Sequence, residues 1–226
     1  MLEGRELLAL LQHGDSFFPS GAVSFSWGVE TLVADGKISK AGDVERFIAG
    51  QLTGRWASSD RPVLLAAVAA KGDLDQVASA DLLMEANNLA AESREGSRRM
   101  GGALLNVHVR LKTPGAKGYQ GHIHASEAPG HVAAVQGLLW SALGLDGDSV
   151  CRMAAHGMAV NILGATLRLG LIGHIDSQTI LGKLHPTIED IVASPPPALD
   201  EIHAYAPAGD IAMMRHETQE SRLFYN

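Results

Sequence analysis

Residues 43–56 read DVERFIAGQLTGRW, and the spacing of their apolar side chains decides the fold class. One apolar stripe recurs at intervals of three to four positions: Val44, Phe47, Ile48, Leu52 and Trp56. This is the period of one face of an α-helix, whereas a half-buried strand would alternate apolar and polar residues. We therefore predict a helix here, beginning at Asp43, because a carboxylate there can cap the first backbone N–H groups.

The same helical spacing recurs along most of the chain, and glycine and proline divide it into segments. Helices are expected around Leu7–Leu11, from Ser20 to Gly36, from Asp43, from Ser59 or Asp60 to Gly72, from Asp73 or Asp75, from Asp81 to Arg110, and over 131–143, 149–171 and 177–192, with Asp148 and Asp176 capping the last two. Residues 112–130, KTPGAKGYQGHIHASEAPG, are rich in breakers and are expected to form a long loop. Pro195–Pro197 predicts an extended segment, followed by a short element over 199–205.

No stretch shows sustained alternation with β-branched enrichment, so no strand is expected. The chain is predicted to be all-α, a single-domain helical bundle of about nine helices. Its 25 glycines are scattered through apolar segments, where small residues let helices approach closely. The pair Gly101–Gly102 therefore marks either a tight helix crossing or a kink.

Composition narrows the class of protein. A chain of 226 residues with 46% apolar residues can bury a core without staples. The net charge of −7 argues against nucleic acid as a partner, because phosphate binding needs clustered Lys and Arg. One cysteine suits a reducing compartment, and no apolar run is long enough to span a membrane, so a cytoplasmic location is expected.

Motifs for several kinds of chemistry are missing from the sequence. A nucleotide-binding P-loop needs Ser or Thr after Gly-Lys, but Ile38 and Leu184 occupy those positions. His216-Glu217 has no second histidine at the zinc-protease spacing, and there is no G-x-S-x-G elbow. We therefore expect no catalytic residue, no cofactor and no enzymatic activity.

Ten histidines leave a metal site as one possibility, because imidazole binds Ni, Zn and Cu. His122 and His124 form an H-x-H pair, and His131 follows seven residues later. On a flexible loop they can bind a metal transiently. The alternative is a set of surface histidines without a ligand, because a site needs a complete set of ligands.

Two terminal segments differ from the rest of the chain. Residues 14–30, GDSFFPSGAVSFSWGVE, interleave serines with three of the five phenylalanines. Residues 210–226, DIAMMRHETQESRLFYN, place apolar groups on both sides of a mixed-charge block. Each segment either packs on the body of its own domain or serves as a surface for a partner, since aromatic residues anchor interfaces. On the second interpretation the body is 1–209 and 210–226 is a partner-binding tail.

Both segments resemble the family of the urease accessory protein UreF. Three internal segments agree with this family in order, SRRMGGALL at 97–105, GLLWSALGLD at 137–146 and AVNILGATLRLGLIGH at 159–174. The resemblance implies an all-α protein that assembles with a UreD (UreH) accessory protein, recruits the GTPase UreG and helps insert nickel into apo-urease. It also implies a homodimer, and it implicates both terminal segments in binding UreD.

The expected partner-binding residues follow from this resemblance. They are Phe17, Phe18, Ser24, Ser26, Trp27, Glu30, Arg215, His216, Glu217, Gln219, Arg222, Leu223 and Phe224. Two alternatives accompany the adaptor hypothesis. In one, Arg215 or Arg222 acts on the GTPase in trans, because a guanidinium can stabilise phosphoryl charge. In the other, His122, His124 and His131 carry nickel.

Overall fold

The computed structural model describes residues 4–21, 25–219 and 223–224, and within these ranges it is helical without strands. The elements are α1 (Gly4–Gly14), α2 (Val29–Ala34), α3 (Ala41–Gln51), the π-helical segment η2 (Leu52–Asp60), α4 (Arg61–Ala69), α5 (Leu74–Asn87), α6 (Ala91–Arg110), α7 (Ala116–His124), α8 (Val132–Ser141), α9 (Gly147–Arg168), α10 (His174–Ala193), the 3₁₀ turn η3 (Leu199–Glu201) and α11 (Pro207–His216). The all-α prediction is confirmed.

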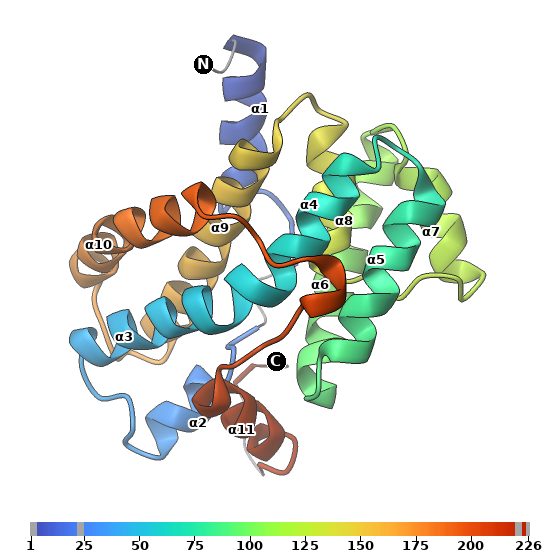
Figure 1. Ribbon diagram of the computed structural model, residues 1–226. Coiled ribbons are helices and arrows are strands. Elements are labelled where there is room, and N and C mark those ends of the chain that lie inside the picture. The colour runs from blue at the N-terminus through green and yellow to red at the C-terminus, as the bar shows by residue number, and fades with distance from the viewer. Residues whose placement is uncertain (1–3, 22–24, 220–222, 225–226) are drawn as a thin grey trace.

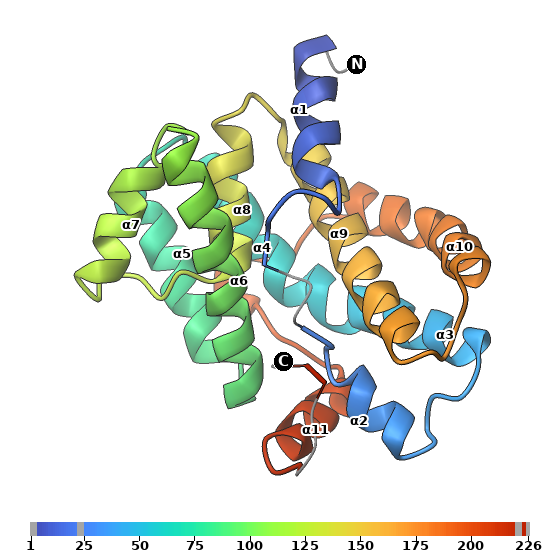
Figure 2. The same ribbon diagram turned by 180° about the vertical axis from the view of Figure 1, so that it is seen from behind.

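The helices form two groups joined by one long rod. Helices α5, α6, α7 and α8 lie on one side, and α9 and α10 on the other (Figure 1). The rod runs through α3, η2 and α4 without interruption and packs against both groups, chiefly through α4 on α8 and α3 on α10. Helices α2 and α11 close one end of the molecule, while α1 projects from the opposite end (Figure 2).

The apolar stripe at 43–56 faces the core along this rod, as its period predicts, with Phe47 half-buried and its other members buried. Asp43 lies in the first turn rather than at the N-cap, and its Oδ2 accepts hydrogen bonds from the Ser39 and Lys40 N–H groups. Helix α4 begins at Arg61 with Asp60 at its N-cap position, as predicted, but Asp60 is itself helical and no break separates α4 from η2. Pro62 has no N–H group to donate to the backbone hydrogen bonds of a helix, and the chain reaches it through the wider π-helical turn. The helix therefore continues through Pro62.

Two other helix boundaries differ from the prediction. The single helix expected over 81–110 is divided, because Asn88 is extended and its carbonyl, with that of Leu89, accepts hydrogen bonds from Arg94. The loop expected over 112–130 contains α7. Tyr119 anchors that helix, since its ring is buried and its hydroxyl donates a hydrogen bond to the Asp81 carboxylate at 2.6 Å.

The helix expected from Ser20 begins only at Val29. Trp27 has φ 56° and Gly28 has φ 79°, so the chain turns through two left-handed residues before α2. Helices α9 and α10 begin two and three residues before their predicted starts, and α9 is capped by Asp146 instead of Asp148. Such errors are ordinary, because several polar residues near a helix start can serve as the cap.

Glycines allow close contacts between elements of the core. A Cβ on Gly137 of α8 would lie 2.3 Å from the Leu64 carbonyl oxygen of α4, so only glycine permits this close crossing. Gly101 packs in the same way on the Gly130 carbonyl, where a Cβ would lie at 2.1 Å. Of the pair 101–102, Gly101 therefore marks a close contact, whereas Gly102 faces open space. In the described ranges, no helix has both the length and the apolar character that crossing a membrane requires.

Candidate functional site

The two terminal segments, nearly two hundred positions apart in sequence, lie side by side in the structure. Helix α11 packs on α2 and on the start of α6 at one end of the molecule (Figure 2). We call this contact between residues 25–35 and residues 207–219 and 223–224 the terminal junction. Most of the residues predicted to bind a partner belong to it.

A buried histidine between two carboxylates forms the centre of the terminal junction. His216 has no exposed side-chain surface. Its Nδ1 lies 2.6 Å from Glu92 Oε1, and its Nε2 lies 3.1 Å from Glu30 Oε2. Each ring nitrogen therefore faces the carboxylate of a different helix. This contact joins α11 to α2 and α6 together.

Glu30 also holds the chain beyond α11. Its carboxylate accepts hydrogen bonds from the backbone N–H of Leu223 at 2.7 Å and of Phe224 at 3.2 Å. The Phe224 ring is buried, with the Arg168 guanidinium 4.5 Å from its centre, whereas Leu223 is 61% exposed. One acidic side chain near the start of α2 therefore positions both described residues at the end of the tail.

The other polar residues of the tail contact the body as well. Both guanidinium Nη atoms of Arg215 donate to the Asp35 carboxylate, which lowers the pKa of Asp35 and raises that of Arg215. The Glu217 carboxylate accepts the Glu92 N–H at the start of α6. Gln219 donates to the Thr31 hydroxyl at 3.1 Å. These contacts orient α11 by hydrogen bonds as well as by packing.

On the N-terminal side, buried aromatic residues form the junction. Phe25 lies on α6 at Gly96, where a Cβ would come within 1.6 Å of its ring. Trp27 packs edge-on against Phe25. Ser26, the residue between them in the sequence, is fully buried. Gly28 approaches α11 so closely that a Cβ would lie 2.9 Å from the Gly209 carbonyl oxygen.

The remaining predicted residues divide into three groups. Phe17 is 91% exposed. Phe18 is half-buried and packs against the rings of His13 and His108, away from the junction. Ser24 and Arg222 lie outside the described residues. The terminal junction therefore gathers most, but not all, of the predicted set.

The outer face of α11 carries apolar residues. Ile211 and Met214, three positions apart on one side of the helix, are both exposed, and Leu223 is exposed beyond the helix. Apolar side chains placed next to a rigid, hydrogen-bonded frame are suited to contact with another protein.

The three histidines proposed for nickel are not brought together. His122 and His124 project from opposite sides of α7, and His122 pairs with Glu127 at 3.1 Å. His131 is buried at the start of α8 and contacts Glu85 at 2.7 Å. Across residues 4–21, 25–219 and 223–224, no cluster of three potential metal ligands exists. The expected flexible loop is a helix, which explains why the set does not assemble.

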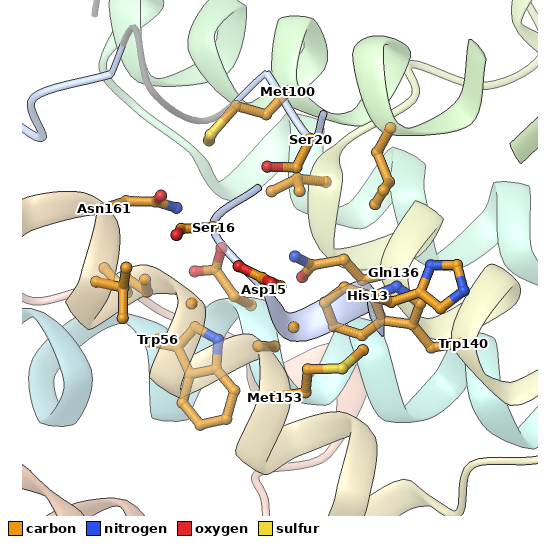
Figure 3. A pocket seen from close by; sticks show the side chains of 18 of the residues that line it. His13, Asp15, Ser16, Ser20, Trp56, Met100, Gln136, Trp140, Met153 and Asn161 are labelled. Atoms are coloured by element: carbon orange, nitrogen blue, oxygen red, sulfur yellow. The ribbon is translucent and has the colours of Figure 1, made fainter. Parts of the chain in front are cut away.

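A pocket of about 90 Å³, partly open to solvent, lies beside the junction (Figure 3). All three tryptophans of the chain, Trp27, Trp56 and Trp140, line it together with Asp60. Polar side chains from the segment after α1 and from α8 and α9 face it, including Ser16, Gln136 and Asn161. We call this cavity the tryptophan chamber.

Several residues that matter in this region were not predicted. Glu92 is buried against His216, although it lies one turn from the exposed i, i+4 pair of Glu95 and Arg99 on the same helix. Arg55 and Asp60 are buried inside the rod, and their charge beside the apolar stripe at 43–56 was the signal available in the sequence.

Comparisons with known proteins agree with this picture. The UreF family pattern matches residues 38–185. A urease accessory protein UreF from Trichodesmium erythraeum is 36% identical over 98% of this chain and 97% of its own. Proteins of the same name from Cereibacter sphaeroides (32% identical) and Actinobacillus pleuropneumoniae (30% identical) each match 97% of this chain and 98% of their own. The chain therefore belongs to the UreF family of urease accessory proteins.

Proposed function

We propose that this protein is a non-catalytic adaptor in urease maturation. In this proposal it works in the cytoplasm as a homodimer, binds a UreD- or UreH-type accessory protein, and recruits a UreG-type GTPase for nickel insertion into apo-urease. Family membership supports the role as a urease accessory protein. The partners are those that the family resemblance implies.

The terminal junction is the observation that carries the proposal. It fixes two distant segments in one place and leaves Ile211, Met214 and Leu223 exposed on its outer side. An adaptor contributes by holding partners close and in a defined orientation, which requires a rigid surface with apolar anchors. In this proposal residues 210–226 are the partner-binding tail.

The test is complex formation with the cognate UreD-type protein, measured by size exclusion and calorimetry. Deleting the tail would remove the buried His216 and Phe224, so point variants are preferable. We expect Ile211→Glu with Met214→Glu to weaken the complex at least tenfold. Ile175→Glu at the exposed start of α10 is the matched control and should bind normally. Equal binding by all three proteins would refute the proposed surface.

Regulation of the GTPase by an arginine is a second candidate. The Arg215 side chain is 56% exposed, so it is accessible, but both of its Nη atoms are engaged by Asp35. An arginine acting in trans would have to leave that carboxylate. Replacing Arg215 with Lys and measuring GTP turnover by the bound GTPase tests the idea, which fails if turnover and binding are both unchanged.

A further inference from the structure

The π-helical segment η2 contains a buried ion pair whose two facing atoms share no hydrogen bond. Arg55 and Asp60 are each less than 5% exposed. Arg55 Nε lies 3.9 Å from Asp60 Oδ2, beyond hydrogen-bond distance. Neither atom has a hydrogen-bond partner elsewhere among the described residues. Buried polar atoms are almost always paired, so two such atoms facing each other call for a specific explanation.

The tail supplies that explanation, because it holds Arg55 from the other side. Arg55 Nη1 donates to Asp210 Oδ1 on α11 at 3.1 Å. Its Nη2 donates to the Ser93 hydroxyl on α6 at 2.6 Å. The guanidinium also lies 5.4 Å from the ring centre of Trp27. Two hydrogen bonds therefore direct the Arg55 guanidinium towards the terminal junction. Its Nε remains beyond hydrogen-bond distance of Asp60.

Asp60 belongs to the wall of the tryptophan chamber. Its burial raises the pKa of its carboxyl, and the nearby Arg55 charge opposes this shift. Trp27 and Trp140 add indole N–H groups that are buried and lack a partner within the described part of the chain. Trp27 also has a left-handed backbone, which a bulky residue adopts only where its surroundings impose it. The chamber wall is thus strained at the point where it meets the tail.

We propose that Arg55 couples docking of α11 to the shape of the tryptophan chamber. With α11 in place, Asp210 holds Arg55 away from Asp60. When α11 is displaced, Arg55 closes the short gap to Asp60, and Trp27 relaxes with the chamber wall. The coupling is a property of the isolated chain, and it goes beyond the proposed function, in which the partner binds α11 in its docked position.

Charge and packing favour this exchange. A buried guanidinium that loses one carboxylate partner gains from approaching the other, because an unpaired buried charge is costly. Both residues lie on η2, and local π-helical turns are frequent at functional sites. Removing α11 also removes the Gly209 carbonyl and Ala212 side chain that confine Gly28, the neighbour of Trp27.

Tryptophan fluorescence tests the proposal directly, since all three tryptophans of the chain line the chamber. We compare Asp210→Asn with Asp35→Asn in the full-length protein. Both remove a carboxylate at the terminal junction, but only the first contacts Arg55. Asp210→Asn should shift the emission and change acrylamide quenching at least twofold, and Asp35→Asn should leave both unchanged. Identical spectra for the two variants would overturn the proposal.

A double-mutant cycle gives an independent measurement for variants that remain folded but show small spectral changes. Asp60→Asn and Asp210→Asn should be non-additive by at least threefold in the unfolding equilibrium constant, because both carboxylates compete for Arg55. The control cycle of Asp60→Asn with Asp35→Asn should be additive. Additivity in both cycles would refute the coupling. These experiments need no partner, so their failure would leave the adaptor function intact, and a failure to bind UreD would leave the coupling intact.

Discussion

The two ends of the chain are attached to the body by different interactions. Helix α11 is held by directional contacts, with His216, Arg215 and Glu217 each bonded to α2 or α6. Helix α1 projects from the body (Figure 1), and its Leu7, Leu8 and Leu11 side chains are exposed. Directional bonds define one geometry, whereas a few apolar contacts leave a face that can pack elsewhere. The comparison shows that the fold fixes the position of α11 more tightly than that of α1.

The largest effect on stability is expected from removing His216, the centre of the terminal junction. His216→Ala leaves Glu30 and Glu92 facing each other in a buried site, and we expect a loss of about 3–5 kcal/mol in the free energy of unfolding. Chemical denaturation measures this loss. His124→Ala on the exposed side of α7 is the control and should change stability by less than about 0.5 kcal/mol. Equal stability of the two variants would show that the junction is not held by this contact.

Packing of the N-terminal segment is tested by a pair of glycines on α6. Gly96→Ala forces the Phe25 ring to move and should cost about 1–3 kcal/mol. Gly102→Ala enters open space on the same helix and should stabilise the protein by up to about 1 kcal/mol through helix propensity. Thermal denaturation of both variants gives the comparison. If both changes stabilise the protein, the Phe25 ring does not pack against Gly96 as described.

The attachment of α1 should depend on pH. His13 stacks on His108 with ring centres 4.9 Å apart, and burial, with a smaller effect of His13, lowers the pKa of His108 to about 4. Unfolding restores an ordinary value of about 6.5, so the unfolded chain binds the proton more readily. Stability from this group is therefore complete above about pH 6.5 and is lost as the pH falls towards 4.

We expect His108→Gln to flatten the decrease of the unfolding midpoint between pH 6.5 and pH 4. Denaturant titrations at several pH values measure that slope. The matched variant His124→Gln should keep the slope of the original protein, since that side chain is exposed. An unchanged slope in His108→Gln would contradict the assignment of the pH dependence to this buried imidazole.

The smallest effect on stability is expected on the open face of α1. Leu8→Gln with Leu11→Gln should change the free energy of unfolding by less than about 0.5 kcal/mol, because both side chains are already in water. The same variant should shift self-association towards the monomer, measured by sedimentation, if the proposed homodimer uses this face. Leu89→Gln, exposed between α5 and α6, is the control. A dimer that resists the double change would place its interface elsewhere.

Much of the fold was predictable because helical periodicity is local. The buried stripe at 43–56, the cap at Asp73 and the extended Pro195–Pro197 segment agree with the prediction. Two of the failures share a cause. Helix α7 and the unbroken rod through Pro62 depend on Tyr119, Asp81 and the π-helical turn, whose contacts come from distant parts of the chain.

The sequence by itself determined that this is an all-α chain of the UreF family with two distinctive ends, because periodicity and motifs lie along the chain. The tertiary structure alone decided that these ends meet, with Glu30 and Glu92 on either side of His216 and with Arg55 between Asp60 and Asp210. No local pattern encodes such pairs. A buried charge is stable only with its partner, and folding chooses that partner from segments that are distant in sequence.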